Sequence, residues 1–595
     1  MSQSTGSAVK NRRSVGRARA SGCRAGFSML AIASIVTMPG VSPASAAPAH
    51  QASQASGPRY NTRANPATNT EVPGCPSKGG TLNVDLDEDV LADLDPSYEP
   101  AAVAYRVDRG VFDSLVYEDS AGKYSPWLAS SWTVSPNKEH YTFVIRKGAT
   151  FSDGTPVNAA AVKFTFDRIE NPNEGSLFAI SLLGPYQGSV LLPGGKVEVN
   201  FTRPYPDFLE AASQAFLGIV SPTAVNKAVA AAHGNQRVGY ANFGLKPVGS
   251  GPFEITSNVV NQQIVEVARP AYNWGPAGLT HKGPACLGKI VFAEVPELST
   301  RVGQLMSGQV GAAETILPPD YQEVQSNPSL NLYVVPGAGA GYQMLINTQE
   351  APWNSVAMRK AFREAIDLPA ILQAVYQGEY IQAWGPIMPH TAYYDPGVEN
   401  SWKYDAKAAD ATFKSLGWKV GRGGYRYKDG KELTMTFAGL SPDRELRQEV
   451  SDYVQSYEKK VGVNFSITNY SVDTALSVLE KGDYGSTATS FITASPSIMY
   501  DFFNSAEIPH GPVFGQNLAR LDVPQINTWT AEANQATTAA LERALWDKVQ
   551  TYVVANAVTI PVTIEPYILG LRNNVHGLVF DRRDYPMWYG VWLGK

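Results

Sequence analysis

Side chains that could carry out chemistry are few and scattered in this sequence. It contains three cysteines and seven histidines, and no Cys-x-x-Cys or His-Glu-x-x-His spacing that would bind a metal ion. The segment Gly249-Ser250-Gly251 lies between Pro247 and Pro252 and does not fit the strand-to-helix turn of a nucleophilic serine. No pair of acidic residues stands out for acid/base catalysis. We therefore expect no catalytic centre, no metal site and no cofactor.

The glycine-rich segment 336–341, Pro-Gly-Ala-Gly-Ala-Gly, is the most flexible interior stretch. Such a loop can cradle phosphate, but neither a Lys-Ser/Thr pair nor a helix signal follows it. We interpret this segment as a crossover or hinge between two lobes.

Cys75 and Cys286 are predicted to form a disulfide. Cys23 lies within an N-terminal export signal and would be removed with it. In an oxidising compartment the two remaining cysteines are expected to pair. Each precedes a predicted strand, 81–84 or 290–293, so their Cα atoms could approach to the roughly 6 Å that a disulfide needs. The alternative is a pair of unbonded buried thiols.

Residues 1–46 have the features of an export signal. A basic head without acidic residues precedes the apolar run 27–41, which is too short to span a membrane comfortably. Ala44-Ser45-Ala46 is a small-x-small cleavage site. We expect a signal peptide cleaved near Ala46 and a protein that is periplasmic or secreted. The basic head contains Lys10, Arg12, Arg13, Arg17, Arg19 and Arg24.

The export route stays open between the Sec and twin-arginine pathways, since the residues after Arg12-Arg13 match the twin-arginine signal poorly. The segment 20–23, Ala-Ser-Gly-Cys, is similar to a lipoprotein box. Cys23 precedes the apolar run instead of following it, so we expect no lipid anchor.

The length and composition indicate a multi-domain globular protein. The chain has 595 residues, 44% of them hydrophobic and 17% charged. The net charge of −5 implies no basic face, so nucleic acid is not an expected partner. Residues 47–77 are rich in Ala, Ser, Pro and Asn and are predicted to be a disordered leader.

From residue 78 onward, strands and helices alternate without repeats. Apolar residues alternate with polar ones at 141–145, 197–201 and 463–467, which predicts strands. Helices are predicted after the caps Asn158 and Asp405, and apolar stripes predict further helices at 358–366, 446–457 and 545–553. This pattern is typical of two α/β lobes.

Residues 151–157, Phe-Ser-Asp-Gly-Thr-Pro-Val, together with residues 158–169, closely resemble the signature of the family 5 bacterial extracellular solute-binding proteins. These are the peptide- and nickel-type receptors of ABC importers. Seven further segments resemble family motifs in the right order, and the resemblance covers about residues 78–590. The seven segments are 94–96, 111–116, 126–132, 246–253, 269–274, 358–367 and 404–418.

The resemblance implies a large two-lobed periplasmic-binding-protein fold of type II, with an extra subdomain in the first lobe. We expect the core of the first lobe in residues 78–116, 246–338 and 566–595. The extra subdomain is expected in 117–245 and the second lobe in 339–565.

One departure from the family concerns the ligand. Peptide-binding members carry an aspartate, in an Asp-Tyr-x-x-Pro setting, that pairs with the peptide α-ammonium. If Pro496 marks the register, Ile492 takes that position here, and Asp501, the nearest acid downstream, lies outside the register. An oligopeptide or modified peptide is the first expectation, and an opine, a sugar oligomer or a metal chelate stay as alternatives.

The family register also indicates candidate ligand-binding residues. Tyr98 and Glu99 follow the Leu-Asp-Pro turn, and Phe178 follows the signature helix. Trp384 lies in a loop of the second lobe. Phe491 and Thr493 lie on the strand that carries the ammonium anchor in relatives, so aromatic side chains from both lobes are expected to hold the solute.

The resemblance therefore implies the solute-binding component of an ABC importer, a monomer that closes its lobes on a solute and delivers it to membrane permease subunits. A ligand sensor that serves a signalling receptor is an alternative. A secreted enzyme on the same scaffold is disfavoured because no nucleophile, base or metal cluster is visible.

Overall fold

The computed structural model describes residues 74–87, 93–99, 101–171, 175–176, 178–441, 443, 445–510 and 515–595. The predicted export signal and the predicted leader up to residue 73 lie outside the described residues. Within the described part of the chain, no helix is both long enough and apolar enough to cross a membrane.

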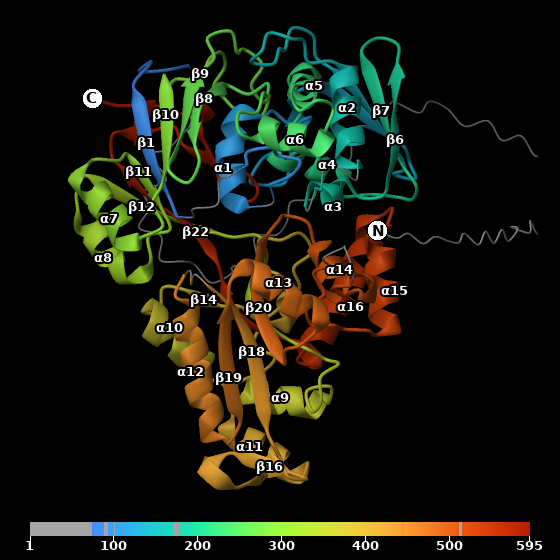
Figure 1. The fold of residues 1–595 in the computed structure, drawn as a ribbon, viewed down its shortest axis with the longest axis vertical. Helices are drawn as coiled ribbons and strands as arrows, with labels where there is room; N and C mark the ends of the chain where they lie inside the picture. Colours follow the sequence, from blue (N-terminus) through green and yellow to red (C-terminus); the bar gives the residue numbers. More distant parts are fainter. Residues whose placement is uncertain are drawn as a thin grey trace, which may run out of the picture. The chain divides into compact units, whose positions relative to one another are not determined.

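Seven described strands form one mixed sheet in the order β12-β22-β11-β1-β10-β9-β8. β1 runs parallel to β10 and β11, and the other pairs are antiparallel. Figure 1 shows α7 and α8 beside this sheet, where they contact β11 and β12. The strands are β1 Thr81–Leu86, β8 Phe253–Val259, β9 Gln263–Ala268, β10 Lys289–Glu294, β11 Ala312–Glu314, β12 Leu330–Pro336 and β22 Pro566–Arg572.

A second sheet has six described strands in the order β14-β21-β13-β20-β18-β19. β18 runs parallel to both β19 and β20, and all eight residues of β13 are buried, as expected for a central strand. The strands are β13 Gly339–Ile346, β14 Ile381–Gln382, β18 Thr434–Leu440, β19 Asn464–Tyr470, β20 Ser486–Ile492 and β21 Thr559–Ile564.

Two neighbouring connections join these sheets. Gly337 and Ala338 lead from β12 to β13, and Glu565 alone leads from β21 to β22. The backbone N–H of Gly337 donates to the carbonyl oxygen of Glu565 at 3.2 Å. A Cβ atom on Gly337 would lie 2.2 Å from that oxygen, so the close approach requires glycine. The glycine-rich segment is thus the predicted crossover between sheets.

A four-stranded antiparallel sheet, in the order β4-β5-β7-β6, lies within the segment predicted as the extra subdomain. Buried and less buried residues alternate along β5 and β7, so one face of the sheet packs against α2. Asn158 caps α2 as predicted, accepting from the N–H of Ala161 at 3.0 Å. The elements are β4 Ala129–Val134, β5 His140–Ile145, β6 Tyr186–Leu192, β7 Lys196–Phe201 and α2 Ala159–Ile169.

The predicted helices and strands are confirmed to within a few residues at their ends. Asp405, for example, caps α11 by accepting from the N–H of Ala408 at 2.9 Å. The remaining helices are α1 Ala102–Val111, α3 Ala179–Leu183, α4 Phe208–Ala211, α5 Pro222–Ala231, α6 Gln236–Gly244, α7 Leu298–Ser307, α8 Pro318–Ser326, α9 Val356–Glu364, α10 Leu368–Tyr376, α11 Ala406–Ser415, α12 Arg447–Lys460, α13 Val472–Lys481, α14 Ile498–Phe503, α15 Pro524–Ala533 and α16 Ala539–Ala555.

Shorter strands complete the described fold as antiparallel sheets of two or three strands. They are β2 Val116–Glu118, β3 Tyr124–Pro126, β15 Lys419–Val420, β16 Arg426–Lys428, β17 Lys431–Glu432, β23 Val575–His576, β24 Val579–Phe580, β25 Pro586–Met587 and β26 Trp592–Leu593. The strands of the seven-stranded sheet fall in residues 81–336 and 566–572, and those of the six-stranded sheet fall in 339–564. The exact domain boundaries stay a prediction.

Candidate functional site

A cavity of about 220 Å³ is lined by residues of two distant parts of the chain, 178–210 and 491–534. We call it the cleft cavity. Phe178 and Phe491 form an apolar wall: their ring centroids lie 5.0 Å apart in an edge-to-face arrangement. Phe178 also packs 4.8 Å from Phe216, and Phe491 lies 6.5 Å from Phe502. The apolar wall is therefore continuous with aromatic side chains that pack behind it in each of the two parts of the chain.

A chain of hydroxyl groups forms the polar side of the cleft cavity. Ser495 donates from Oγ to Asp207 Oδ2 at 2.6 Å, and the Oγ atoms of Ser495 and Ser497 lie 2.7 Å apart. The backbone N–H of Ser495 donates to Thr493 Oγ1 at 3.2 Å. Burial raises the pKa of Asp207 to about 6, and the Ser495 hydroxyl offsets part of that rise. Ser495, together with Lys138 and Ser497, thus favours the charged form of Asp207.

Carboxylates dominate the charge of the cleft cavity. Glu210 is neutralised by a buried ion pair with Arg583. The carboxyl group of Asp501 on α14 has no hydrogen bond or ion pair to a described residue, and burial, followed by the charge of Glu507, raises its pKa to about 8. A cationic group placed here would be stabilised by Asp207 and Asp501, because both carboxyl groups lose solvation, and only Asp207 is partly compensated, by the charge of Lys138 and hydroxyl groups.

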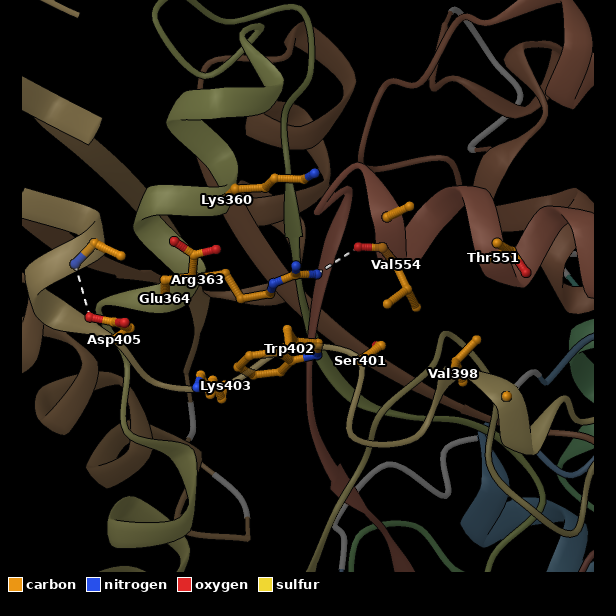
Figure 2. Close-up of a pocket in the computed structure, with 13 residues that line it drawn as sticks. Lys360, Arg363, Glu364, Val398, Ser401, Trp402, Lys403, Asp405, Thr551 and Val554 are labelled. Carbon is orange, nitrogen blue, oxygen red and sulfur yellow. Dashed lines mark hydrogen bonds between the residues drawn. The ribbon is translucent and has the colours of Figure 1, made fainter. Parts of the chain in front are cut away.

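A second and larger cavity, of about 520 Å³, lies among α9, the loop before α11 and α16 (Figure 2). It shares no lining residue with the cleft cavity and is built only from residues 360–408 and 551–555. We call it the side cavity. No residue of the seven-stranded or four-stranded sheet lines the side cavity. The side cavity is therefore not formed by closure of the two lobes.

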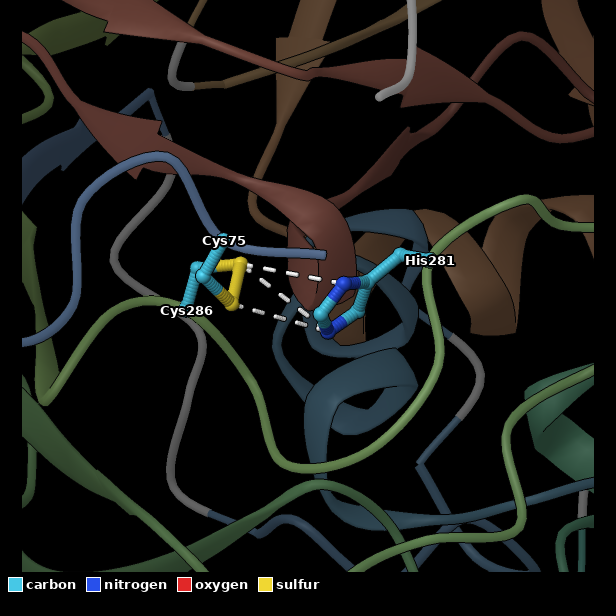
Figure 3. A group of neighbouring side chains, drawn as sticks. All are labelled: Cys75, His281 and Cys286. Carbon is cyan, nitrogen blue, oxygen red and sulfur yellow. Dashed lines mark hydrogen bonds between the residues drawn. A yellow bond between two sulfur atoms is a disulfide. The ribbon is translucent and has the colours of Figure 1, made fainter. Parts of the chain in front are cut away.

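Cys75 and Cys286 form a disulfide, with their Cα atoms 5.3 Å apart. The buried ring of His281 lies against it, with Nε2 4.0 Å from the sulfur of Cys75 and Nδ1 3.8 Å from that of Cys286 (Figure 3). These three side chains could together hold a metal ion if the cysteines were thiolates. The bond between the sulfurs removes both thiolates, so the donor set does not fit a metal ion in this state.

Comparison with known proteins identifies the family. The family model described as bacterial extracellular solute-binding proteins, family 5 Middle, matches residues 123–508. The chain belongs to this family. Among curated relatives, the glutathione-binding protein GsiB of Shigella dysenteriae is 25% identical over 500 residues, which are 81% of this chain and 89% of the relative.

Solved structures of similar proteins show the fold of this family 5 protein. The periplasmic binding protein DppA of Helicobacter pylori, in complex with the peptide STSA, is similar with a TM-score of 0.73 and 22% identity, covering 87% of this chain and 99% of that one. NikA of Brucella suis, in complex with Fe(III)-EDTA, has a TM-score of 0.74 and 21% identity, covering 87% and 100%. The fold is therefore the predicted two-lobed periplasmic-binding-protein fold.

The structure brings together three of the six ligand-binding candidates of this family 5 protein. Phe178, Phe491 and Thr493 line the cleft cavity. Tyr98 and Glu99 do not: the side chain of Tyr98 is exposed, and Glu99 accepts a hydrogen bond from the N–H of Ala101. The role of all six in binding a solute stays a prediction.

Trp384 lies outside the lining of the cleft cavity. Its ring packs 5.6 Å from the ring of Trp402, which lines the side cavity. The loop that carries Trp384 is therefore anchored to the core around the six-stranded sheet, where the large apolar surface of a tryptophan is more stable than in water.

Sequence reasoning missed Asp207 and Ser495 and set Asp501 aside. Ile492, at the position of the family anchor, is partly buried and packs against apolar clusters on both sides. Asp501 is brought to the cleft cavity because α14 turns back after Pro496. The helix-forming run after Pro496 could have indicated the position of Asp501, because a helix after a strand can bring a downstream side chain back to the end of that strand.

Proposed function

We propose that this family 5 protein is the solute receptor of an ABC importer, which closes two lobes on its ligand and passes it to membrane permease subunits without altering it. The observation that carries the proposal is the cleft cavity, because its walls come from segments on both sides of the two crossovers. A solute that touches both walls stabilises the closed form.

For the solute we propose a peptide or peptide-like molecule with a free ammonium group. Asp501 supplies the carboxylate that Ile492 cannot supply, and Asp207 lies on the opposite wall. Phe178 and Phe491 offer the apolar surface on which a side chain of the solute can pack. A volume of about 220 Å³ suits one amino-acid residue, so the cavity accommodates the first residue of a peptide and the remainder requires the walls to part.

The titration of Asp501 supports a cationic ligand. A buried carboxyl group with a pKa of about 8 is mostly protonated at pH 7, and an ammonium group beside it favours the ionised form. The solute thereby gains a charge-assisted hydrogen bond, the strong class of polar contact. The relatives named above agree with this choice in part, since the solved structure of DppA is a complex with a peptide.

The experiment begins with native mass spectrometry of the purified full-length mature protein, to identify solutes that remain bound. The identified peptide, in free-amine and N-acetylated forms, is then titrated by calorimetry into the wild type and into Asp501→Asn. We expect acetylation and Asp501→Asn each to weaken binding at least about tenfold. Asp501→Asn should not further weaken the acetylated form.

The matched control is Asp483→Asn, because Asp483 is exposed and lines neither cavity. It should leave the affinity within a factor of two. Equal affinity for both forms of the peptide would remove the ammonium anchor from the proposal. If the protein bound no peptide or peptide-like solute at all, the proposal that it is a solute receptor for such molecules would be wrong.

We further propose that the mature protein is a monomer that starts after Ala46 and acts outside the cytoplasm. The signal-like sequence of residues 1–46 and the extracellular family support this localisation. The mass of the native protein tests the cleavage site, and a diacylglyceryl-modified N-terminal cysteine would contradict it.

A further inference from the structure

The side cavity contains a buried guanidinium whose hydrogen-bonding capacity is largely unused. Arg363 reaches from α9 toward α16, where its Nη1 donates to the carbonyl oxygen of Val554 at 2.7 Å (Figure 2). Its side chain is buried, and Nε has no partner. No hydrogen bond joins Nη2 to a described residue either. The Nε–Nη2 edge is the edge that binds a carboxylate in a bidentate manner.

Arg359, one turn earlier on the same helix, is a buried arginine whose Nε is bonded. Its Nε donates to the carbonyl of Asn556 at 3.1 Å and its Nη1 to that of Trp353 at 2.9 Å. Arg359 lines no part of the side cavity. Other buried arginines, such as Arg106 and Arg109, also have an unpartnered Nε. What distinguishes Arg363 is that it has an unpartnered Nε and lines the side cavity.

Trp402 offers a second unused donor. Its Nε1–H is buried without a hydrogen-bond partner, and its ring lies under Arg363, with Cζ 5.0 Å from the ring centroid. Such stacking orients the guanidinium but does not neutralise it. Val398 and Val554 form an apolar part of the wall. The cavity thus combines donor groups with surface that could pack against a hydrocarbon group.

The charges around the side cavity favour an anion. Lys360 and Lys403 line it with Arg363, and the acids that line it are Glu364 and Asp405. Asp405 already accepts from the N–H of Ala408 as the cap of α11. Burial raises the pKa of Glu364 and lowers that of Arg363 to about 10, while the charge of Glu364 raises the latter. Arg363 is therefore charged at neutral pH, and it forms no ion pair within 4 Å with a described carboxylate.

We propose that the side cavity is a second binding site, for a small organic anion. The carboxylate of the anion meets the free edge of Arg363 and the ammonium groups of Lys360 and Lys403, and its apolar body lies against Val398 and Val554. The volume of about 520 Å³ is in the range of small-molecule sites. The site is separate from the cleft cavity and does not depend on the identity of the solute bound there.

The test is a calorimetric titration of the full mature protein with benzoate, its neutral analogue benzamide, and inorganic phosphate, at pH 7.5 and low ionic strength. We expect saturable binding of benzoate with a dissociation constant at or below about 1 mM and binding of benzamide at least about tenfold weaker. Phosphate binding as tight as that of benzoate would contradict the role of the apolar wall. Absence of saturable benzoate binding would overturn the proposal.

Three variants locate the binding. Arg363→Gln should weaken benzoate binding at least about tenfold, and Lys403→Gln about threefold, by loss of positive charge. Glu364→Gln should strengthen it, because a negative charge beside the anion is removed. Lys407→Gln is the matched control for Lys403→Gln, since Lys407 is exposed and outside the lining.

The variants also separate the proposal from its main rival, in which Glu364 is the real partner of Arg363. In that case Glu364→Gln would lower the free energy of unfolding and would not strengthen benzoate binding. If Arg363→Gln fails to fold, the Lys403→Gln and Glu364→Gln results decide. Unchanged benzoate affinity in both of these would place the binding elsewhere and end the proposal.

Discussion

Ser495 donates a hydrogen bond of 2.6 Å to the carboxylate of Asp207, although 288 residues separate them in sequence. Asp207 precedes α4, in the segment that follows the four-stranded sheet, whereas Ser495 follows β20 of the six-stranded sheet. The bond therefore joins the two walls of the cleft cavity. The carboxyl group of Asp207 is buried, and this burial raises its pKa to about 6. A hydrogen bond to this group is therefore expected to contribute to the stability of the contact between the walls.

Ser495→Ala is expected to favour the open form. Loss of the hydroxyl removes a hydrogen bond to a charged group, worth about 1.5–3 kcal/mol at most, and leaves Asp207 less well solvated. We expect solute affinity to fall about fivefold and the radius of gyration of the unliganded protein, measured by small-angle X-ray scattering, to increase. Ser441→Ala, at an exposed position, is the control. An unchanged radius and affinity in Ser495→Ala would show that this bond does not hold the lobes.

Local signals predicted most of the fold. Asn158 and Asp405 begin their helices as expected, because a cap acts through the next three residues of the chain. The crossover at residues 337–338 followed from its glycines, which permit the contact with Glu565.

The cleft cavity was predicted only in part. Phe178, Phe491 and Thr493 were indicated by the family register. Asp207 could not be indicated, because its role depends on a serine 288 residues away. The loop of Trp384 shows the same limit, since its ring packs on Trp402 and no local pattern encodes that contact.

The stability of the unliganded protein should decrease as pH rises, in part through Asp501. Burial raises the pKa of Asp501 to about 8, whereas an unfolded aspartate titrates near pH 4. Between these values the folded state holds the proton and the unfolded state does not, so the free energy of unfolding falls as pH rises through this window. Below about pH 4 both states are protonated and the contribution is constant.

Asp501→Asn tests this pH dependence because asparagine cannot ionise. We expect the wild type to lose on the order of 4 kcal/mol more than Asp501→Asn between pH 5 and pH 9, measured by urea unfolding. Asp483→Asn should follow the wild type. Parallel pH profiles for the wild type and Asp501→Asn would mean that Asp501 is ionised in the folded protein at neutral pH.

Phe491→Ala and Trp384→Ala are expected to differ in their effects. Phe491 lines the cleft cavity and meets Phe178, so its removal should weaken solute binding by about 1 kcal/mol or more. Trp384 packs on Trp402 within the core of the six-stranded sheet, so its removal should lower the urea midpoint and leave solute affinity within a factor of two. Calorimetric titration and urea unfolding of both variants measure the two effects. The opposite assignment would place Trp384 in the solute site.

The disulfide is expected to stabilise the fold by closing a long loop. Cys75 and Cys286 are separated by 211 residues, and in the chain-entropy model cross-linking so long a loop stabilises by about 5 kcal/mol, with about 2 kcal/mol as a cautious lower value. The mature protein should show no titratable thiol in denaturant without reductant and two after reduction. The double variant Cys75→Ser and Cys286→Ser should unfold at lower urea concentration by a matching amount. Because neither cysteine lines the cleft cavity, solute affinity should be unchanged in the folded double variant. Two free thiols in the untreated protein would show that the pair is not bonded.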